Sequence, residues 1–239
     1  MSVDGKELEI FRRSVPFGTA EEHGLYFVAF SAERSRYDRM LARMFGTAGD
    51  GVRDRLDYTL FRPFNFIGPN LDNVEEPKEG SSRVFTQFLS NVLYKRPIKL
   101  VDGGSQKRSF TYIDDAIEAL LTILENKDGC ASRRIFNIGN PNNCISIRDL
   151  AQRTIRIAQE FPVLRDNARA TEVVDVSAGE YYGKYYQDIQ VRVPNVEAAR
   201  RDLGWQPSTD MDTAIRRTIE FYVKQEGFGT RAAAMAAGI

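Results

Sequence analysis

The run RPIKLVDGGSQKRSFTYIDDAIEALLTILEN, residues 96–126, restricts the fold more than any other part of the sequence. Its apolar start favours a short β-strand, Gly103 and Gly104 mark a tight turn, and a second short strand follows. Apolar residues then recur at helical spacing, so we expect a helix capped by Asp114 or Asp115. Its expected buried face is Ile117, Leu120, Leu121 and Leu124.

The rest of the chain alternates in the same way. Short strands are expected within residues 7–13, 25–30, 57–69 and 133–141, and the expected helices are residues 82–94, 147–158 after Ser146 as cap, 195–203 and 211–224. A further amphipathic helix is expected from Ala29, with apolar positions up to Phe45 and an end at Gly46. No linker or repeat is visible, so residues 1–239 are interpreted as a single compact α/β or α+β unit with a tail at 224–239.

The composition excludes several classes of protein. Lys plus Arg and Asp plus Glu both number 33, so the net charge of zero gives no reason to expect nucleic acid or an anionic membrane as a partner. One histidine and two cysteines leave almost no material for a His-based metal site, a Ser-His-Asp triad or a disulfide scaffold. No apolar run approaches 18 residues and no signal peptide is visible, so a cytoplasmic location is expected.

Three polar stretches are candidates for a site. The glycines of residues 46–51 follow a helix and precede charged residues, which indicates a loop and not a dinucleotide fingerprint. Lys99, Lys107 and Arg108 bring three cations to the Gly103-Gly104 turn, either as a grip for a diphosphate or as a solvated hairpin. The segment EYYGKYYQDIQVR, residues 180–192, suits a sugar or nucleotide and suits a protein interface equally well.

Several longer segments resemble the extended short-chain dehydrogenases that act on nucleotide sugars, and among them the UDP-glucuronic acid decarboxylases. The resemblance rests on TLFRPFNFIGPNLDNV, GSSRVFTQFL, PIKLVDGGSQKRSFTYIDDAIEALLTILEN, IFNIGNP and YYGKYYQDIQVRVPNVEAARRDLGWQP. It covers about residues 26–223 and implies an α/β fold. The glycine-rich strand-turn-helix that binds NAD in this family has no counterpart in the sequence. We therefore expect a truncated Rossmann-like fold that keeps the C-terminal substrate-binding subdomain and lacks most of the NAD-binding sheet.

The resemblance also implies roles for individual residues. Asn65 would contact the substrate, Arg83 would lie near the phosphates, and residues 99–108, including Lys99, Lys107 and Arg108, would wrap the uridine diphosphate. Tyr186 would touch the nucleotide sugar. Arg192 matches the position of the proposed proton donor in decarboxylation.

The family's catalytic helix carries Tyr-x-x-x-Lys, in which the lysine lowers the tyrosine's pKa so that it can act as a base. Alignment on Asp38-Arg39 places Phe30 and Arg34 at these two positions, so the base is absent and NAD-dependent redox chemistry is not expected. We accordingly expect no cofactor, neither NAD nor a metal.

Three hypotheses for the function follow. In the first, the chain is a non-redox isomerase, lyase or decarboxylase that uses Arg192, Tyr186, Asn65 and Lys99, with Asp188 or one of the tyrosines as acid or base. In the second, it is a non-catalytic nucleotide-sugar-binding or regulatory subunit that pairs with a full-length enzyme. The third is an NAD-dependent decarboxylase completed by a second chain. All three imply a small-molecule or UDP-sugar-like ligand, and a homo-oligomer or a hetero-oligomer with a related enzyme that covers the exposed sheet edges.

Overall fold

The computed structural model describes residues 2–3, 6–7, 11–18, 23–30, 38, 42, 58–75, 83–181 and 189–225, with backbone alone in the strands before residue 31 and at 180–181. The chain divides into two compact units, residues 1–57 and residues 58–239, where the sequence analysis expects one. Each unit is described by itself below.

The first unit contains two pairs of antiparallel strands. Strands β1 (Ser2–Val3) and β2 (Lys6–Glu7) pair with each other, and β3 (Phe11–Gly18) forms a hairpin with β4 (His23–Phe30). Strand β4 contains the expected strand 25–30 and begins two residues earlier, at His23. Strand β3 shares only residues 11–13 with the expected strand 7–13 and continues to Gly18. The expected helix start at Ala29 is wrong, because Ala29 and Phe30 pair with Arg12 and Phe11 as the end of β4. The described residues Asp38 and Ala42 are helical.

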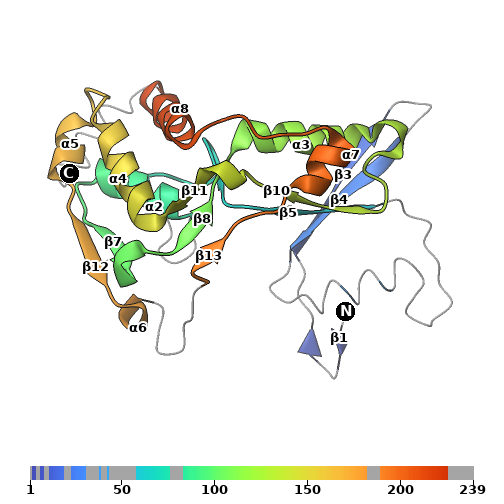
Figure 1. Cartoon of the computed structure of the whole chain (residues 1–239), viewed down its shortest axis with the longest axis horizontal. Coiled ribbons are helices and arrows are strands. Elements are labelled where there is room, and N and C mark those ends of the chain that lie inside the picture. The colour runs from blue at the N-terminus through green and yellow to red at the C-terminus, as the bar shows by residue number, and fades with distance from the viewer. Residues whose placement is uncertain are drawn as a thin grey trace. The chain divides into compact units, whose positions relative to one another are not determined.

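The second unit alternates strands and helices along the chain (Figure 1). Its strands are β5 (Thr59–Pro63), β6 (Phe66–Ile67), β7 (Ile98–Val101), β8 (Lys107–Ser109), β9 (Thr111–Tyr112), β10 (Arg134–Ile138), β11 (Cys144–Ser146), β12 (Val173–Val176) and β13 (Val191–Arg192). Its α-helices are α2 (Val84–Leu93), α3 (Ile113–Glu125), α4 (Ile147–Ala158), α5 (Arg165–Ala170), α6 (Ala178–Tyr181), α7 (Glu197–Leu203) and α8 (Met211–Val223). Short 3-10 turns lie at Asp102–Gly104, Lys127–Gly129 and Pro141–Asn143. These elements confirm the alternation expected from the sequence.

The described strands form small sheets rather than one large one. Strand β5 pairs in parallel with β10, β7 with β12 and β6 with β9, whereas β8 lies between antiparallel β11 and parallel β13. Parallel pairing between strands distant in the sequence requires crossover connections, and helices supply them here. The fold is therefore α/β, as expected.

Two hydrophobic cores stabilise this unit. The first joins α2, α4, α8 and β7 through Leu89, Leu150, Ile215, Ile98 and Leu100, all completely buried. The second joins β10 to α3 and α7, and its members include Phe136, Ile138, Ala119, Ala199 and Trp205. Full burial of each leucine, isoleucine or phenylalanine side chain in these cores contributes about 1.5–3 kcal/mol.

Helix α3 buries a different face from the one expected. Ile117, Leu121 and Leu124 are 44%, 53% and 42% exposed, whereas Ala116 and Ala119 are completely buried. The small alanine side chains allow α3 to approach its neighbours closely, which the bulky stripe would prevent. The expected cap is also wrong: α3 begins after Tyr112, and Asp114 and Asp115 lie in its first turn.

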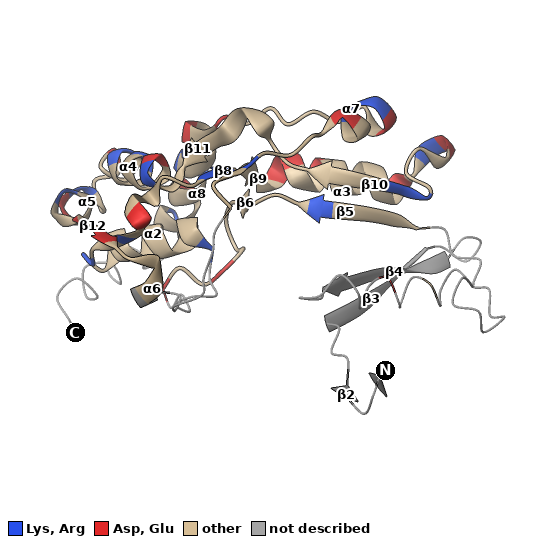
Figure 2. Cartoon of the chain, turned by 60° about the horizontal axis from the view of Figure 1, so that its bottom comes forward, with Lys and Arg blue, Asp and Glu red and all other residues tan. Residues whose placement is uncertain are grey.

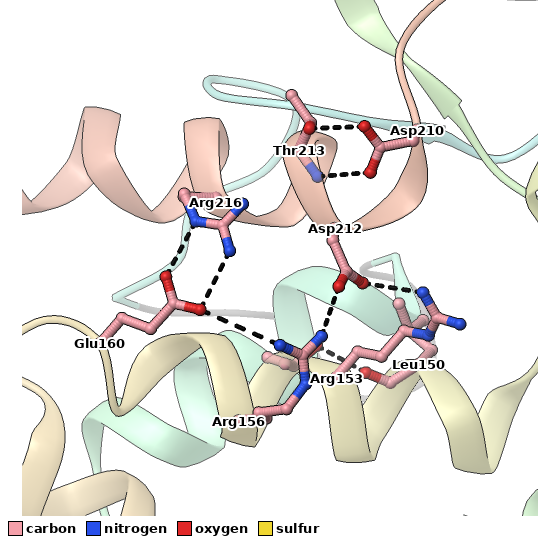
Figure 3. Close-up of polar contacts among 9 residues, drawn as sticks. Leu150, Arg153, Arg156, Glu160, Asp210, Asp212, Thr213 and Arg216 are labelled. Carbon is pink, nitrogen blue, oxygen red and sulfur yellow. Dashed lines mark hydrogen bonds and ion pairs between the residues drawn. The ribbon is translucent and has the colours of Figure 1, made fainter.

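Helices α4 and α8 are joined by ion pairs as well as by the first core (Figure 3). Asp212 of α8 accepts hydrogen bonds from Arg153 and Arg156 of α4, and Arg216 donates both of its hydrogen bonds to the Glu160 carboxylate. At the start of α4, the Ser146 hydroxyl accepts from the Asp149 N–H, which confirms the expected cap. No helix in the described part of the chain is both long and apolar enough to cross a membrane.

Candidate functional site

The structure brings together two of the residues that the sequence marks as candidates, Asn65 and Arg192. Asn65 lies in the turn between β5 and β6, and Arg192 is the last residue of β13. The Asn65 side chain donates from Nδ2 to the carbonyl oxygen of Ser109 at 2.9 Å, and its Oδ1 accepts from Arg192 Nη2 at 3.3 Å. A guanidinium carries five N–H donors, so Arg192 can donate to a negatively charged or hydroxyl-rich ligand as well as to Asn65.

Arg108 lies in strand β8, beside Arg192. The two residues are direct partners in the parallel β8–β13 pairing. Arg108 is 9% exposed, and its Nη1 donates to the carbonyl oxygens of Lys107 at 2.9 Å and Ile189 at 2.6 Å. These bonds fix the guanidinium next to β13. Two arginines on adjacent strand positions favour an anion such as a diphosphate.

The chain around Gly103 and Gly104 does not form the expected β-hairpin. Asp102, Gly103 and Gly104 have φ angles of 46°, 73° and 65°, so the chain turns out of β7 before β8 begins. Strand β7 pairs with β12, and β8 pairs with β11 and β13. Lys99 and Lys107, both exposed, therefore lie in different sheets.

Arg148 of α4 holds this turn in place. Its Nε donates to the Gly103 carbonyl at 2.8 Å, and its Nη2 forms an ion pair with Asp175 of β12 at 2.7 Å. Gly104 has a second reason to be a glycine, since a Cβ there would lie 3.0 Å from the Arg148 backbone nitrogen. The turn is thus anchored to α4 and β12.

Arg83 lies in a separate set of contacts. It precedes α2, and its Nη1 bonds to Asp72 Oδ1 and to the Leu71 carbonyl, both at 2.8 Å. Thr86 donates to the same Asp72 carboxylate. These contacts tie Arg83 to the loop after β6, and no described contact joins it to Asn65 or Arg192.

Four of the predicted positions cannot be placed with the others. Tyr186, Asp188 and Arg34 lie outside the described residues. Phe30 closes strand β4 of the first unit. Their predicted roles stay predictions.

A cavity of about 360 Å³ lies beside the loop after β6. It is lined by Asn70, Asp72, Asn73, Val74, Glu75, Tyr222 and Gln225. Burial raises the pKa of Tyr222, whose hydroxyl oxygen accepts the Asn70 N–H at 3.0 Å. Neither Asn65 nor Arg192 lines this cavity.

Sequence reasoning missed the residues that support the Asn65–Arg192 pair. Thr111 bonds to the turn that carries Asn65, and Gly139 lies between that turn and the segment after Arg192. A Cβ on Gly139 would come within 2.9 Å of the Phe64 Cβ and 2.6 Å of the Pro194 Cγ. The one available signal was a polar threonine inside the apolar run FTYI.

Two protein families match parts of this chain. Residues 38–139 match the NAD dependent epimerase/dehydratase family. Residues 1–63 match a different family, the C-terminal part of Dyp-type peroxidases. The first match begins after Phe30 and Arg34, so the alignment of these two residues with a catalytic Tyr-x-x-x-Lys lies outside it.

Solved structures of similar fold agree with the first match. The chain is 42% identical to the PbgP3 protein from Burkholderia pseudomallei, with a TM-score of 0.64, over 85% of this chain and 53% of that one. It is similar in fold to UDP-glucose 4-epimerase from Thermotoga maritima, at 20% identity, a TM-score of 0.56, and 79% and 50% coverage. It is also similar in fold to UDP-glucuronic acid 4-epimerase from Bacillus cereus, solved with UDP-glucuronic acid and NAD. The identity is 19%, the TM-score is 0.51, and the match covers 68% of this chain and 44% of that one.

The chain spans about half the length of these solved structures. Its α/β fold is of their Rossmann-like, extended short-chain dehydrogenase type. Two of these similar structures are named as epimerases of UDP-glucose and UDP-glucuronic acid.

The expectation that no cofactor is involved is wrong, because the matched family is described as NAD dependent and similar structures were solved with NAD. In this fold class the dinucleotide pyrophosphate binds where a strand is followed by a glycine-rich turn and a helix. No strand within residues 58–75, 83–181 and 189–225 is followed by such a turn opening an α-helix. The described residues of the second unit therefore do not supply the strand, turn and helix that would hold the dinucleotide pyrophosphate.

Proposed function

We propose that residues 58–225 form the nucleotide-sugar-binding part of an NAD-dependent enzyme that modifies the sugar. The observation that carries this proposal is the contact between Asn65 and Arg192, which lie 127 positions apart in the sequence. The resemblance of both residues to substrate-contacting positions, and the 42% identity to PbgP3 over most of this chain, support it.

The roles follow from the chemistry of the side chains. Arg108 and Arg192, adjacent on paired strands, supply positive charge for a diphosphate or for a sugar carboxylate. Asn65 supplies an amide that can exchange hydrogen bonds with sugar hydroxyl groups. A sugar acid linked to a nucleoside diphosphate satisfies all three groups, so we propose a UDP-uronic acid as the ligand and decarboxylation or epimerisation of that sugar as the reaction.

The hypotheses of a non-redox enzyme and of a non-catalytic or regulatory subunit rested on an absent NAD site and on the absence of a Tyr-x-x-x-Lys base, and they stay predictions. In the function proposed above, Arg192 acts on the substrate directly. Whether it donates a proton is decided by kinetics, because loss of a proton donor lowers kcat, whereas loss of uniform binding raises KM with kcat unchanged.

The test measures UDP-glucuronic acid and UDP binding to the full chain by isothermal titration calorimetry. We expect Arg192→Ala to weaken UDP-glucuronic acid binding by about 10-fold to 100-fold, the equivalent of one lost charge-assisted hydrogen bond. Arg200→Ala is the matched control, since Arg200 is an exposed arginine on α7 whose ion pair is with Glu197. A wild-type chain that binds neither ligand, or an Arg192 variant that binds as tightly as the Arg200 variant, would refute the proposal.

A further inference from the structure

Thr111 lies where three segments of the second unit meet. It belongs to β9 and is completely buried. Its hydroxyl donates to the Phe64 carbonyl at 3.0 Å and accepts from the Asn140 backbone N–H at 3.0 Å. Its own backbone N–H donates to the Asn65 carbonyl at 3.2 Å. Thr111 therefore binds both carbonyl groups of the turn that presents Asn65.

Asn65 needs such support because of its backbone conformation. Its φ angle is 39°, in the left-handed region, which costs a non-glycine residue of order 1 kcal/mol or more unless its surroundings hold it. Asparagine tolerates this region better than most residues do. The turn is held by the two bonds from Thr111 and by the bond from Asn65 Nδ2 to the Ser109 carbonyl. With Nδ2 fixed in this way, Oδ1 is the atom left to face Arg192.

We infer that Thr111 is a positioning residue for the nucleotide-sugar site, because its hydroxyl holds the Asn65 turn in the conformation that pairs Asn65 with Arg192. This inference rests on the proposed function. The hydroxyl is the essential group, since it serves as donor and acceptor at the same time. Valine has almost the same shape and can do neither, and it would leave the Asn140 N–H and the Phe64 carbonyl without this partner.

The experiment compares Thr111→Val and Thr111→Ser in the full chain. Serine keeps the hydroxyl and loses the methyl group. Thr154→Val is the matched control, because Thr154 is equally buried and its hydroxyl bonds to the Leu150 carbonyl within α4. Two quantities are measured: the dissociation constant for UDP-glucuronic acid, and the position of the Asn65 side-chain amide signals in ¹⁵N NMR spectra, assigned by their loss in Asn65→Asp.

We expect Thr111→Val to weaken UDP-glucuronic acid binding at least fivefold and to shift the Asn65 amide signals. Thr111→Ser should stay within twofold of the wild type in affinity with those signals in place. Thr154→Val should lower stability and change neither quantity. A folded Thr111→Val variant with unchanged Asn65 signals overturns the inference whatever its affinity, and so does a folded Thr111→Ser variant whose Asn65 signals shift.

Two features keep the test decisive. If Thr111→Val does not fold, the Thr111→Ser variant decides: Asn65 signals that stay in place support the role of the hydroxyl, and signals that shift overturn it. The NMR measurements need no ligand. A wild-type chain that fails to bind UDP-glucuronic acid therefore refutes the proposed function, whereas the Asn65 signals alone decide whether Thr111 holds the turn.

Discussion

Replacing Asp115 with asparagine should destabilise the second unit strongly, although the two side chains have nearly the same shape. Asp115 lies in the first turn of α3 and is 5% exposed. Its Oδ2 accepts from the backbone N–H groups of Ser208 and Thr209 at 3.3 and 3.0 Å, and its Oδ1 accepts from both of their hydroxyls at 3.3 and 3.0 Å. The carboxylate thus fixes the turn before α8 by four hydrogen bonds.

The loss of stability follows from the hydrogen-bond donors for which asparagine offers no acceptor. An amide has one accepting oxygen, and its NH₂ group faces the remaining two donors. Each donor left unsatisfied in a buried position costs about 1–3 kcal/mol, so the free energy of unfolding should fall by about 2–5 kcal/mol. For a chain of this size that corresponds to a decrease in Tm of about 5–15 °C.

Trp205, the chain's single tryptophan, makes the assay direct. It is 3% exposed, and its Nε1 donates to the Asp115 carbonyl at 2.8 Å. Urea unfolding followed by tryptophan fluorescence therefore monitors the region that is changed. Asp114→Asn is the control, since the Asp114 side chain is exposed on the same turn and its replacement should cost less than about 0.5 kcal/mol. Equal midpoints for the two variants would show that the Asp115 bonds do not stabilise the turn.

Two further predictions concern packing and charge. Gly139→Ala should lower the free energy of unfolding by about 1–3 kcal/mol and weaken nucleotide-sugar binding, because the new Cβ would lie 2.9 Å from Phe64 and 2.6 Å from Pro194 and must move them. Urea unfolding measures the first effect and titration calorimetry the second. Burial would raise the pKa of Asp212, but hydrogen bonds from Arg156 and Arg153 outweigh it and hold the pKa below its usual value. The stability gained from the lowered pKa is present above the pKa of Asp212 in the unfolded state and is lost as the pH falls through its pKa in the folded state. The Tm difference between wild type and Asp212→Asn should therefore shrink between about pH 5 and pH 3.

Each of these predictions has a result that contradicts it. Gly179→Ala is the control for Gly139→Ala, because among the described residues, its own helix and chain neighbours aside, no atom lies within 4 Å of a Cβ placed there. Equal losses of stability in the two glycine variants would show that the close approach to Phe64 and Pro194 is unimportant. A Tm difference for Asp212→Asn that stays constant from pH 7 to pH 3 would mean that ionisation of Asp212 does not stabilise the contact between α4 and α8.

Hydrophobic spacing predicted where most elements of the second unit lie, because local periodicity follows directly from helix and strand geometry. It did not predict which side of α3 is buried. Both Ala116-Ala119 and Ile117-Leu121-Leu124 recur at helical spacing, and only the approach of neighbouring elements selects the alanine face. For the same reason the sequence could not show that Asp115 binds Ser208 and Thr209 rather than capping its own helix.

The sequence predicted some features of the candidate site correctly and others not. Asn65, Arg108 and Arg192 were identified by resemblance, and the structure places them on neighbouring elements. Lys99 and Lys107 were expected on one hairpin, but the positive φ angles from Asp102 to Gly104 send β7 and β8 into different sheets. Turn geometry of this kind depends on the pairing partners available, which are distant in the sequence.

By itself the sequence determined the alternation of strands and helices and the balanced charge that Figure 2 shows as basic and acidic residues side by side on α4, α5 and α7. It also carries the motifs that resemble those of dehydrogenases acting on nucleotide sugars. The tertiary structure alone decided that Asn65 contacts Arg192, that the Thr111 hydroxyl bonds to the Phe64 carbonyl in the turn between β5 and β6, and that a side chain on Gly139 would collide with Phe64 and Pro194. Periodicity and composition are local properties, and each residue carries them along the chain. Contacts between residues far apart in the sequence depend on how the chain packs, and in this protein those contacts make the site.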